Sequence, residues 1–301
     1  MNLQFIVDGI LTGSIIGLGA IGVTLTYSIL RFSNFAHGEL ISWGAYAALA
    51  ISGILGWLVG GSGDAIGPLS FGWNLIIAGL IAMLFTGALA LVLDLILFRH
   101  LRKANAITVV MASFGASMAL RSLLEFIFTS QPTYFNRELQ ISMRLGLGIR
   151  VTPDQLALVG LTGFLVLAMH LLLTRTQTGR AMRAVSENPA LSRVVGIDVE
   201  MIVRVTWILG GALACASGVM VGILVQIRPY MGFDLLLPLF AAAILGGIGS
   251  VPGALIGGLI VGLAEAGAVP LIGAQWRAAV AFLLLLGVLL IRPTGLFGRR
   301  E

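Results

Sequence analysis

The chain has 301 residues, of which 58% are hydrophobic and only 10% are charged, and its mean hydropathy is +1.03. This composition excludes an ordinary soluble domain and is typical of a protein made of membrane-spanning helices. The net charge of +5 comes mainly from arginines between the apolar runs. This charge therefore reflects the orientation of the spans in the membrane and does not indicate a nucleic-acid partner.

Long apolar runs follow one another along the chain. Because a bilayer core requires about 20 apolar residues per helix, we expect spans at roughly 5–30, 40–60, 74–98, 105–128, 155–174, 200–226 and 275–292. The segment 235–270 is also apolar, but the run LGGIGSVPG at 245–253 interrupts it. Each half is expected to be too short to cross, so the segment is either a re-entrant hairpin or two crossings with a linker. The predicted fold class is an all-α polytopic membrane protein with about eight membrane segments.

Basic residues near the ends of the spans predict the orientation of the chain, because they concentrate on the cytoplasmic side. They occupy three regions. These are the 99–104 connection with Arg99, His100, Arg102 and Lys103, the central loop with Arg175, Arg180, Arg183 and Arg193, and the C-terminus with Arg292, Arg299 and Arg300. The 60–73 loop holds Asp64 and no basic residue, which places it outside. We therefore expect a periplasmic N-terminus and a cytoplasmic C-terminus. The external 129–154 loop departs from the rule, since it carries Arg137, Arg144 and Arg150.

The polar stretch from Thr176 to Val203 contains the signals of a short helix. Asn188 is a favourable N-cap, Pro189 suits the first helical position, and Gly196 suits a left-handed stop. Asp198 can cap the membrane helix that follows. The helical spacing of three aliphatic side chains gives one apolar face, and arginines and a glutamate surround it: Leu191, Val194, Val195, Arg180, Arg183, Arg193 and Glu187. Such a helix at a membrane surface needs another protein to pack against.

Few polar residues interrupt the apolar runs, and each has two interpretations. Asn34 and His37 are expected to cap helix ends, with Glu39 in the first turn of the second span, or else to serve a pathway or gate. Arg121 and Glu125 lie four residues apart on one span, which favours a mutual ion pair over a contact with substrate. Glu265 is a candidate to line a cavity, with Arg277 as its partner.

No set of residues indicates catalysis or a cofactor. The three histidines are isolated from further ligands, so no metal site is expected. A phosphate-binding loop needs a lysine after its last glycine, and the only lysine is Lys103, which follows Arg102. We therefore expect a protein that is not an enzyme and does not itself hydrolyse ATP through that motif.

Four ordered motifs resemble the bacterial branched-chain amino acid ABC permeases of the LivH type. The first is NFAHGE at 34–39, and the second joins GRAMRA at 179–184 to Glu187-Asn188-Pro189 and Gly196-Ile197. The others are LGGIGS at 245–250 with Pro252-Gly253, and RPTGL at 292–296. One departure is that Ala190-Leu191-Ser192 stands where the wider importer loop has Glu-Ala-Ala, so an ion pair from position 190 to an ATPase cannot be assumed.

The resemblance implies an inner-membrane importer in which residues 1–301 form a single permease domain and 175–200 its ATPase-coupling loop. Its partners would be a second, LivM-like permease, two cytoplasmic ATPases that bind ATP, a periplasmic binding protein and membrane lipid. The substrates would be branched-chain amino acids, although relatives with these motifs import urea, short amides or aromatic acids. A proton-coupled secondary transporter is the other class, but it does not explain the arginine-rich loop. The translocation-pathway candidates are Asn34, His37, Glu39, Gly246, Gly247, Gly249 and Glu265.

Overall fold

The computed structural model describes residues 3–59, 65–102, 104–135, 140, 142–146, 149–292 and 294–297. Asp64, Lys103, Arg137, Pro293, Arg299 and Arg300, on which part of the charge and motif reasoning depends, lie outside these residues. In chain order the elements are α1 (Gln4–Leu30), α2 (His37–Val59), α3 (Trp73–Leu93), the π-helical η1 (Asp94–Phe98), α4 (Arg99–Leu101), α5 (Ala106–Phe128), β1 (Met143–Gly146), β2 (Ile149–Val151), α6 (Pro153–Arg175), α7 (Gln177–Glu187), α8 (Pro189–Val194), α9 (Val199–Leu224), α10 (Met231–Gly246), α11 (Val251–Ile272), the 3₁₀ helix η2 (Ala274–Trp276) and α12 (Arg277–Ile291).

The described residues contain eight helices that are long and apolar enough to cross a membrane, which confirms the all-α polytopic fold class. The third runs without a break from Trp73 to Leu101 through the π-helical turn, three residues beyond the predicted end. The expectation that both halves of the 235–270 segment are too short is wrong for α11, whose 22 residues extend about 33 Å. Of the two halves, only α10, with 16 residues and about 24 Å, is shorter than a bilayer core.

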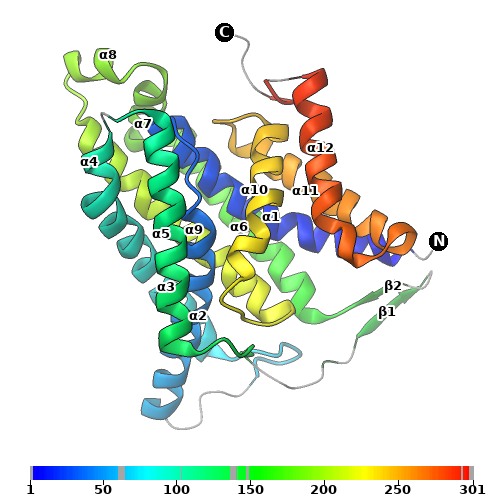
Figure 1. Cartoon of the computed structure of the whole chain (residues 1–301). Coiled ribbons are helices and arrows are strands. Elements are labelled where there is room, and N and C mark those ends of the chain that lie inside the picture. The colour runs from blue at the N-terminus through cyan, green and yellow to red at the C-terminus, as the bar shows by residue number, and fades with distance from the viewer. Residues whose placement is uncertain are drawn as a thin grey trace.

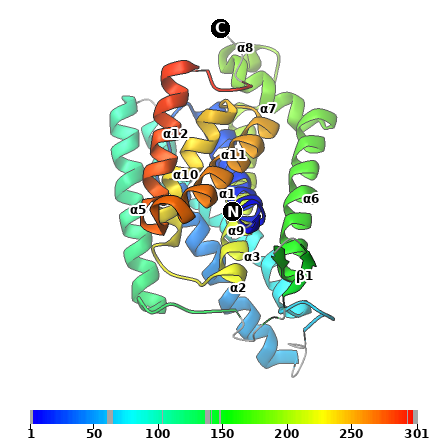
Figure 2. The same ribbon diagram turned by 90° about the vertical axis from the view of Figure 1, so that its right-hand side faces the viewer.

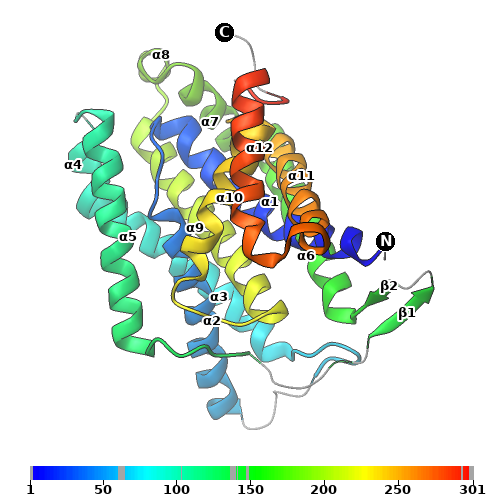
Figure 3. The ribbon, with the colours of Figure 1, turned by 45° about the vertical axis from the view of Figure 1, so that its right-hand side comes forward.

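α7 and α8 occupy one end of the molecule, which we call the α7–α8 end, while β1 and β2 lie toward the opposite end, the hairpin end (Figures 1 and 3). In a second view α5 and α6 lie on opposite sides, with α1, α10 and α11 between them (Figure 2). β1 and β2 form an antiparallel pair with Met143 opposite Val151, a strand pair that the sequence did not predict. The backbone of Arg150 exchanges hydrogen bonds of 2.9 and 3.1 Å with the side chain of Gln4, which ties this hairpin to the start of α1.

Close backbone approach between α1 and α11 forms the centre of the packing. A Cβ atom on Gly13 would lie 2.7 Å from Cα of Leu259, and one on Gly258 would lie 2.5 Å from the backbone N of Gly17. Side chains would therefore separate the two helices at these positions. Small residues allow membrane helices to pack with their backbones close together, which is how this glycine-rich sequence is used.

The connection between α1 and α2 does not stay at the surface. A Cβ on Gly22 would lie 2.7 Å from the ring of His37, so the first residue of α2 lies beside a position eight residues before the end of α1 at Leu30. Eight helical residues correspond to about 12 Å along α1. The 31–36 segment thus returns into the interior before α2 begins. In Figure 1 it is the irregular connection that descends beside α9 and α5.

The glycine turn between α10 and α11, in contrast, lies at the α7–α8 end. The backbone N–H groups of Leu296 and Phe297, after α12, donate hydrogen bonds of 2.8 and 3.2 Å to the carbonyls of Leu245 and Gly246. Gly249 lies near Ser28, close to the end of α1. The interrupted backbone of this segment is therefore not at mid-depth. The element that starts in the interior is α10, whose Gly232 packs directly on Gly38 of α2.

Candidate functional site

The central loop has the helix that its sequence predicts. Asn188 accepts a hydrogen bond of 2.9 Å from the backbone N–H of Leu191, so it caps α8, and Pro189 is the first residue of this helix. Gly196 has φ +85° and ends the turn that follows. Asp198 accepts a hydrogen bond of 3.1 Å from the N–H of Met201 and caps α9. These local signals position α8 between α7 and the membrane helix α9.

The apolar side chains of α8 point away from the protein. Leu191 is 59% exposed, Val194 is 82% exposed and Val195 is 67% exposed, whereas Ser192 is buried. The predicted charged residues Arg180, Arg183, Glu187 and Arg193 are also exposed. α8 lies at the tip of the α7–α8 end (Figure 3), where these residues give it an aliphatic surface with basic residues around it.

A second helix of this loop, α7, was not predicted. Its Met182 and Val185 are buried at 2% and 1% exposure, and they follow the buried Gly179 at a spacing of three residues, which was a readable helical signal. Arg31, just after α1, donates a hydrogen bond of 2.7 Å to the carbonyl of Ser186. α7 therefore connects the exposed α8 firmly to the body of the protein.

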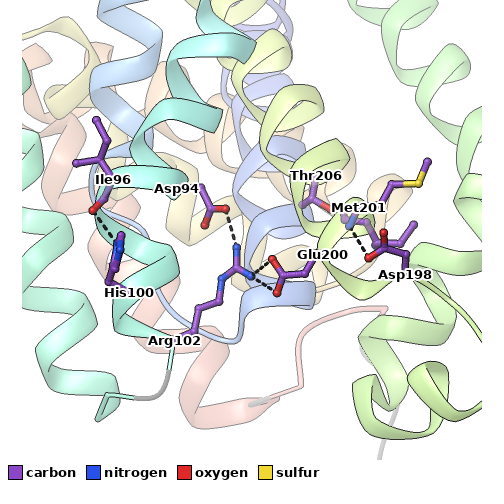
Figure 4. Close-up of polar contacts among 9 residues, drawn as sticks. Asp94, Ile96, His100, Arg102, Asp198, Glu200, Met201 and Thr206 are labelled. Atoms are coloured by element: carbon purple, nitrogen blue, oxygen red, sulfur yellow. Dashed lines mark hydrogen bonds and ion pairs between the residues drawn. The ribbon is translucent and has the colours of Figure 1, made fainter.

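Beneath this loop an arginine joins three elements (Figure 4). Arg102 donates to Asp94 of η1 at 2.6 Å and to both carboxylate oxygens of Glu200, in the first turn of α9, at 2.7 and 2.8 Å. Asp94 is 1% exposed, so its charge depends on this contact. The partner of Asp94 is thus Arg102, across the π-helical turn, and the network holds the end of the third span against the start of α9.

A buried ion pair lies in the interior. Arg121 of α5 contacts Oε1 of Glu39 at 2.5 Å, and the hydroxyl of Ser117 donates to the same oxygen at 3.0 Å. The prediction that Arg121 pairs with Glu125 is wrong, because no ion pair joins these two described residues. Glu39 has no exposed surface, and a buried carboxylate without a partner is strongly destabilising, so Glu39 requires the guanidinium of Arg121.

Apart from the half-buried Phe35, the remaining residues of the 34–39 motif are buried as well. Oδ1 of Asn34 accepts a hydrogen bond of 3.1 Å from the N–H of Ala36, so Asn34 does stabilise the start of α2. His37 is 1% exposed and packs beside Gly22, so its ring does not cap a helix end. Within the described residues no group of three or more His, Cys, Asp or Glu side chains is placed to hold a metal ion.

The seven pathway candidates do not form one site. Asn34, His37 and Glu39 lie together in the interior, whereas the glycine turn lies at the α7–α8 end. That turn contains Gly246, Gly247 and Gly249, of which the last two have φ +93° and +91°. Glu265 is 5% exposed and lines a separate cavity of about 300 Å³, which Arg277 also lines. The two were predicted to be partners, and they share this cavity without an ion pair.

Known proteins match this chain along almost its whole length. LivH of Escherichia coli K12, a high-affinity branched-chain amino acid transport system permease protein, is 32% identical over 99% of this chain and 96% of its own. BraD of Pseudomonas aeruginosa, with the same description, is 33% identical over the same shares. A probable LivH of Methanocaldococcus jannaschii is 27% identical over 98% of this chain and 92% of its own.

A family model covers most of the chain. It is described as the permease component of the branched-chain amino acid transport system, and it matches residues 5–290. This range includes all eight membrane-spanning helices and α7 and α8, except for the first residue of α1 and the last of α12. The chain therefore belongs to the branched-chain amino acid transport permease family.

Proposed function

We propose that this chain is the membrane-spanning permease subunit of an ABC importer for branched-chain amino acids in the bacterial inner membrane. Residues 1–301 act as one permease domain, which pairs with a second permease of the LivM type. Two cytoplasmic ATPases bind and hydrolyse ATP, and a periplasmic binding protein delivers the substrate. In this proposal the α7–α8 end faces the cytoplasm, and the chain itself catalyses no reaction.

The single observation that carries this proposal is the exposed aliphatic face of α8. Leu191, Val194 and Val195 are each more than half exposed at the end of the molecule, although burial of one such side chain stabilises by roughly 1.5–3 kcal/mol. A short helix that presents apolar anchors fits a groove on a partner protein. Arg180, Arg183 and Arg193 around it suit acidic groups at the rim of that groove.

Replacement of both Leu191 and Val194 with Asp tests the coupling role. We expect loss of co-purifying ATPase and of ATP-driven uptake at normal permease abundance, because the exchange removes two apolar anchors and would bury two carboxylates. Gln177→Asp is the matched control, since it adds one charge at an exposed position of α7 and should leave both readouts unchanged. A double variant that keeps its ATPase and its transport would refute the coupling role of α8.

Orientation and substrate need separate tests. Cys215, the only cysteine of the sequence, is fully buried, so cysteines introduced at the exposed Ala190 and Met143 can be labelled selectively. A membrane-impermeant maleimide should label position 143 and spare position 190 in intact cells. Vesicles that contain the full complex should import leucine, isoleucine or valine with ATP. Uptake of only urea, amides or aromatic acids, or uptake driven by protons without ATP, would contradict the proposed function.

A further inference from the structure

A cavity between α1, α11 and α12 combines charge with an apolar wall. Its volume is about 300 Å³, and it is distinct from the glycine turn and from the Glu39–Arg121 pair. It lies toward the start of α1, the second half of α11 and the first residue of α12. Its charged and apolar lining includes Asp8, Glu265, Arg277, Phe5, Ala266 and Val269.

A carboxylate oxygen of Glu265 lacks a hydrogen-bond partner among the described residues. Glu265 is 5% exposed, and its Oε1 atom is buried without a hydrogen bond from any described residue. A buried carboxylate without a partner is unfavourable, so such a group usually has a ligand, an ion or water. A cation of suitable size in the cavity would satisfy it.

Arg277 provides the opposite charge. It lines the same cavity and interacts with Glu265 through space, yet the two do not form an ion pair. Arg277 is exposed, and its guanidinium donates no hydrogen bond to the described residues, so it remains available for an anionic group. Asp8, the other carboxylate, is exposed and already accepts a hydrogen bond of 3.1 Å from Gln4. The separated pair is therefore Glu265 and Arg277.

We propose that this cavity binds the zwitterion of an aliphatic amino acid, with its ammonium group at Glu265 and its carboxylate at Arg277. Phe5, Ala266 and Val269 provide the apolar wall for the side chain. This inference rests on the proposed function and adds a substrate-binding site within this chain. Because Glu265 and Arg277 contact only the groups that all amino acids share, the cavity captures amino acids without selecting among their side chains.

Three ligands distinguish the contact at Glu265 from the contact at Arg277. Leucine carries both charges, leucinamide lacks the carboxylate, and 4-methylpentanoate lacks the ammonium group. Binding of each is measured on the purified full-length chain in nanodiscs of phosphatidylglycerol. The wild type should bind leucine at least about tenfold more tightly than either analogue, because each analogue lacks one charged hydrogen-bonding group.

Charge-removing variants should abolish one preference each. Glu265→Gln should bind leucine and 4-methylpentanoate equally, whereas Arg277→Gln should bind leucine and leucinamide equally. Asp234→Asn, which removes an exposed carboxylate of α10 outside the cavity, should keep both preferences. Absence of leucine binding by a wild-type chain that is folded by size-exclusion chromatography would overturn the proposal. Equal effects of all three variants, or tighter binding of leucinamide than leucine, would overturn it too.

A phospholipid headgroup with an ammonium and a phosphate presents similar charges. Nanodiscs with phosphatidylethanolamine therefore form a second arm, and strong competition with leucine there would assign the cavity to lipid and overturn the proposal. Uptake by the full complex keeps this result separate from the proposed function. If the complex imports leucine with ATP and both cavity variants import it at the wild-type KM and rate, the cavity assignment fails while the permease function remains.

Discussion

The buried ion pair between Glu39 and Arg121 predicts a large and specific loss of stability when its cation is removed. Glu39 has no exposed surface and Arg121 is 13% exposed at the side chain. The guanidinium also lies 4.9 Å from the ring centre of Tyr230 and 4.4 Å from that of Phe233. Arg121→Met removes the charge and keeps much of the side-chain volume, so it isolates the electrostatic contribution.

The size of the effect follows from this burial. Two unit charges 4 Å apart attract by about 4 kcal/mol at an effective dielectric constant of about 20. Removal of one partner of a buried pair typically costs about 3–5 kcal/mol, since the other charge stays desolvated. We therefore expect Arg121→Met to lower the free energy of unfolding by about 3–5 kcal/mol. The double variant Glu39→Gln/Arg121→Met should recover about 1–3 kcal/mol, because no buried charge remains.

The assay is unfolding of the purified protein by titration of a denaturing detergent into mild micelles, followed by helical circular dichroism. Arg228→Met is the matched control, since Arg228 and Asp234 form a pair of 3.7 Å whose side chains are 47% and 57% exposed. Removal of this exposed pair should change the unfolding free energy by less than about 1 kcal/mol. If the double variant proves as unstable as Arg121→Met alone, the loss arises from packing, and the electrostatic reasoning is refuted.

Two further predictions use the same titration. Gly258→Ala should lower the free energy of unfolding by about 1–3 kcal/mol, because the new methyl group meets the backbone of Gly17. Gly79→Ala is the control, since its methyl group meets no described atom within 4 Å and should be tolerated. Equal effects of the two variants would contradict the close approach of α1 and α11. Asp94→Asn should lower the free energy of unfolding by roughly 1–3 kcal/mol, since it deprives Arg102 of its buried partner. Glu200→Gln should lower it by less than about 1 kcal/mol, since the Glu200 side chain is 43% exposed. The reverse order would show that Asp94 does not anchor this network.

The elements that depend on neighbouring residues along the chain were predictable. Transfer of an apolar helix into a bilayer depends on its own composition, so the spans follow from runs of about 20 apolar residues. The start of α8 at Pro189, its cap at Asn188 and the stop at Gly196 are local for the same reason, because each requires only a side chain and a backbone within a few residues. The motifs along the chain were sufficient to indicate its family.

Contacts between distant segments were decided only by the tertiary structure. Arg121 and Glu125 are four residues apart, but Arg121 pairs with Glu39, 82 residues away, because packing of α2 against α5 buries Glu39 beside it. The depth of His37 depends on how the 31–36 segment returns along α1, and the position of the Gly246–Gly249 turn depends on the hydrogen bonds that the C-terminal segment makes to it. The cavity that Glu265 and Arg277 share exists only where three helices meet. A buried charge takes the partner that the fold brings near it, and spacing along one helix does not encode that partner.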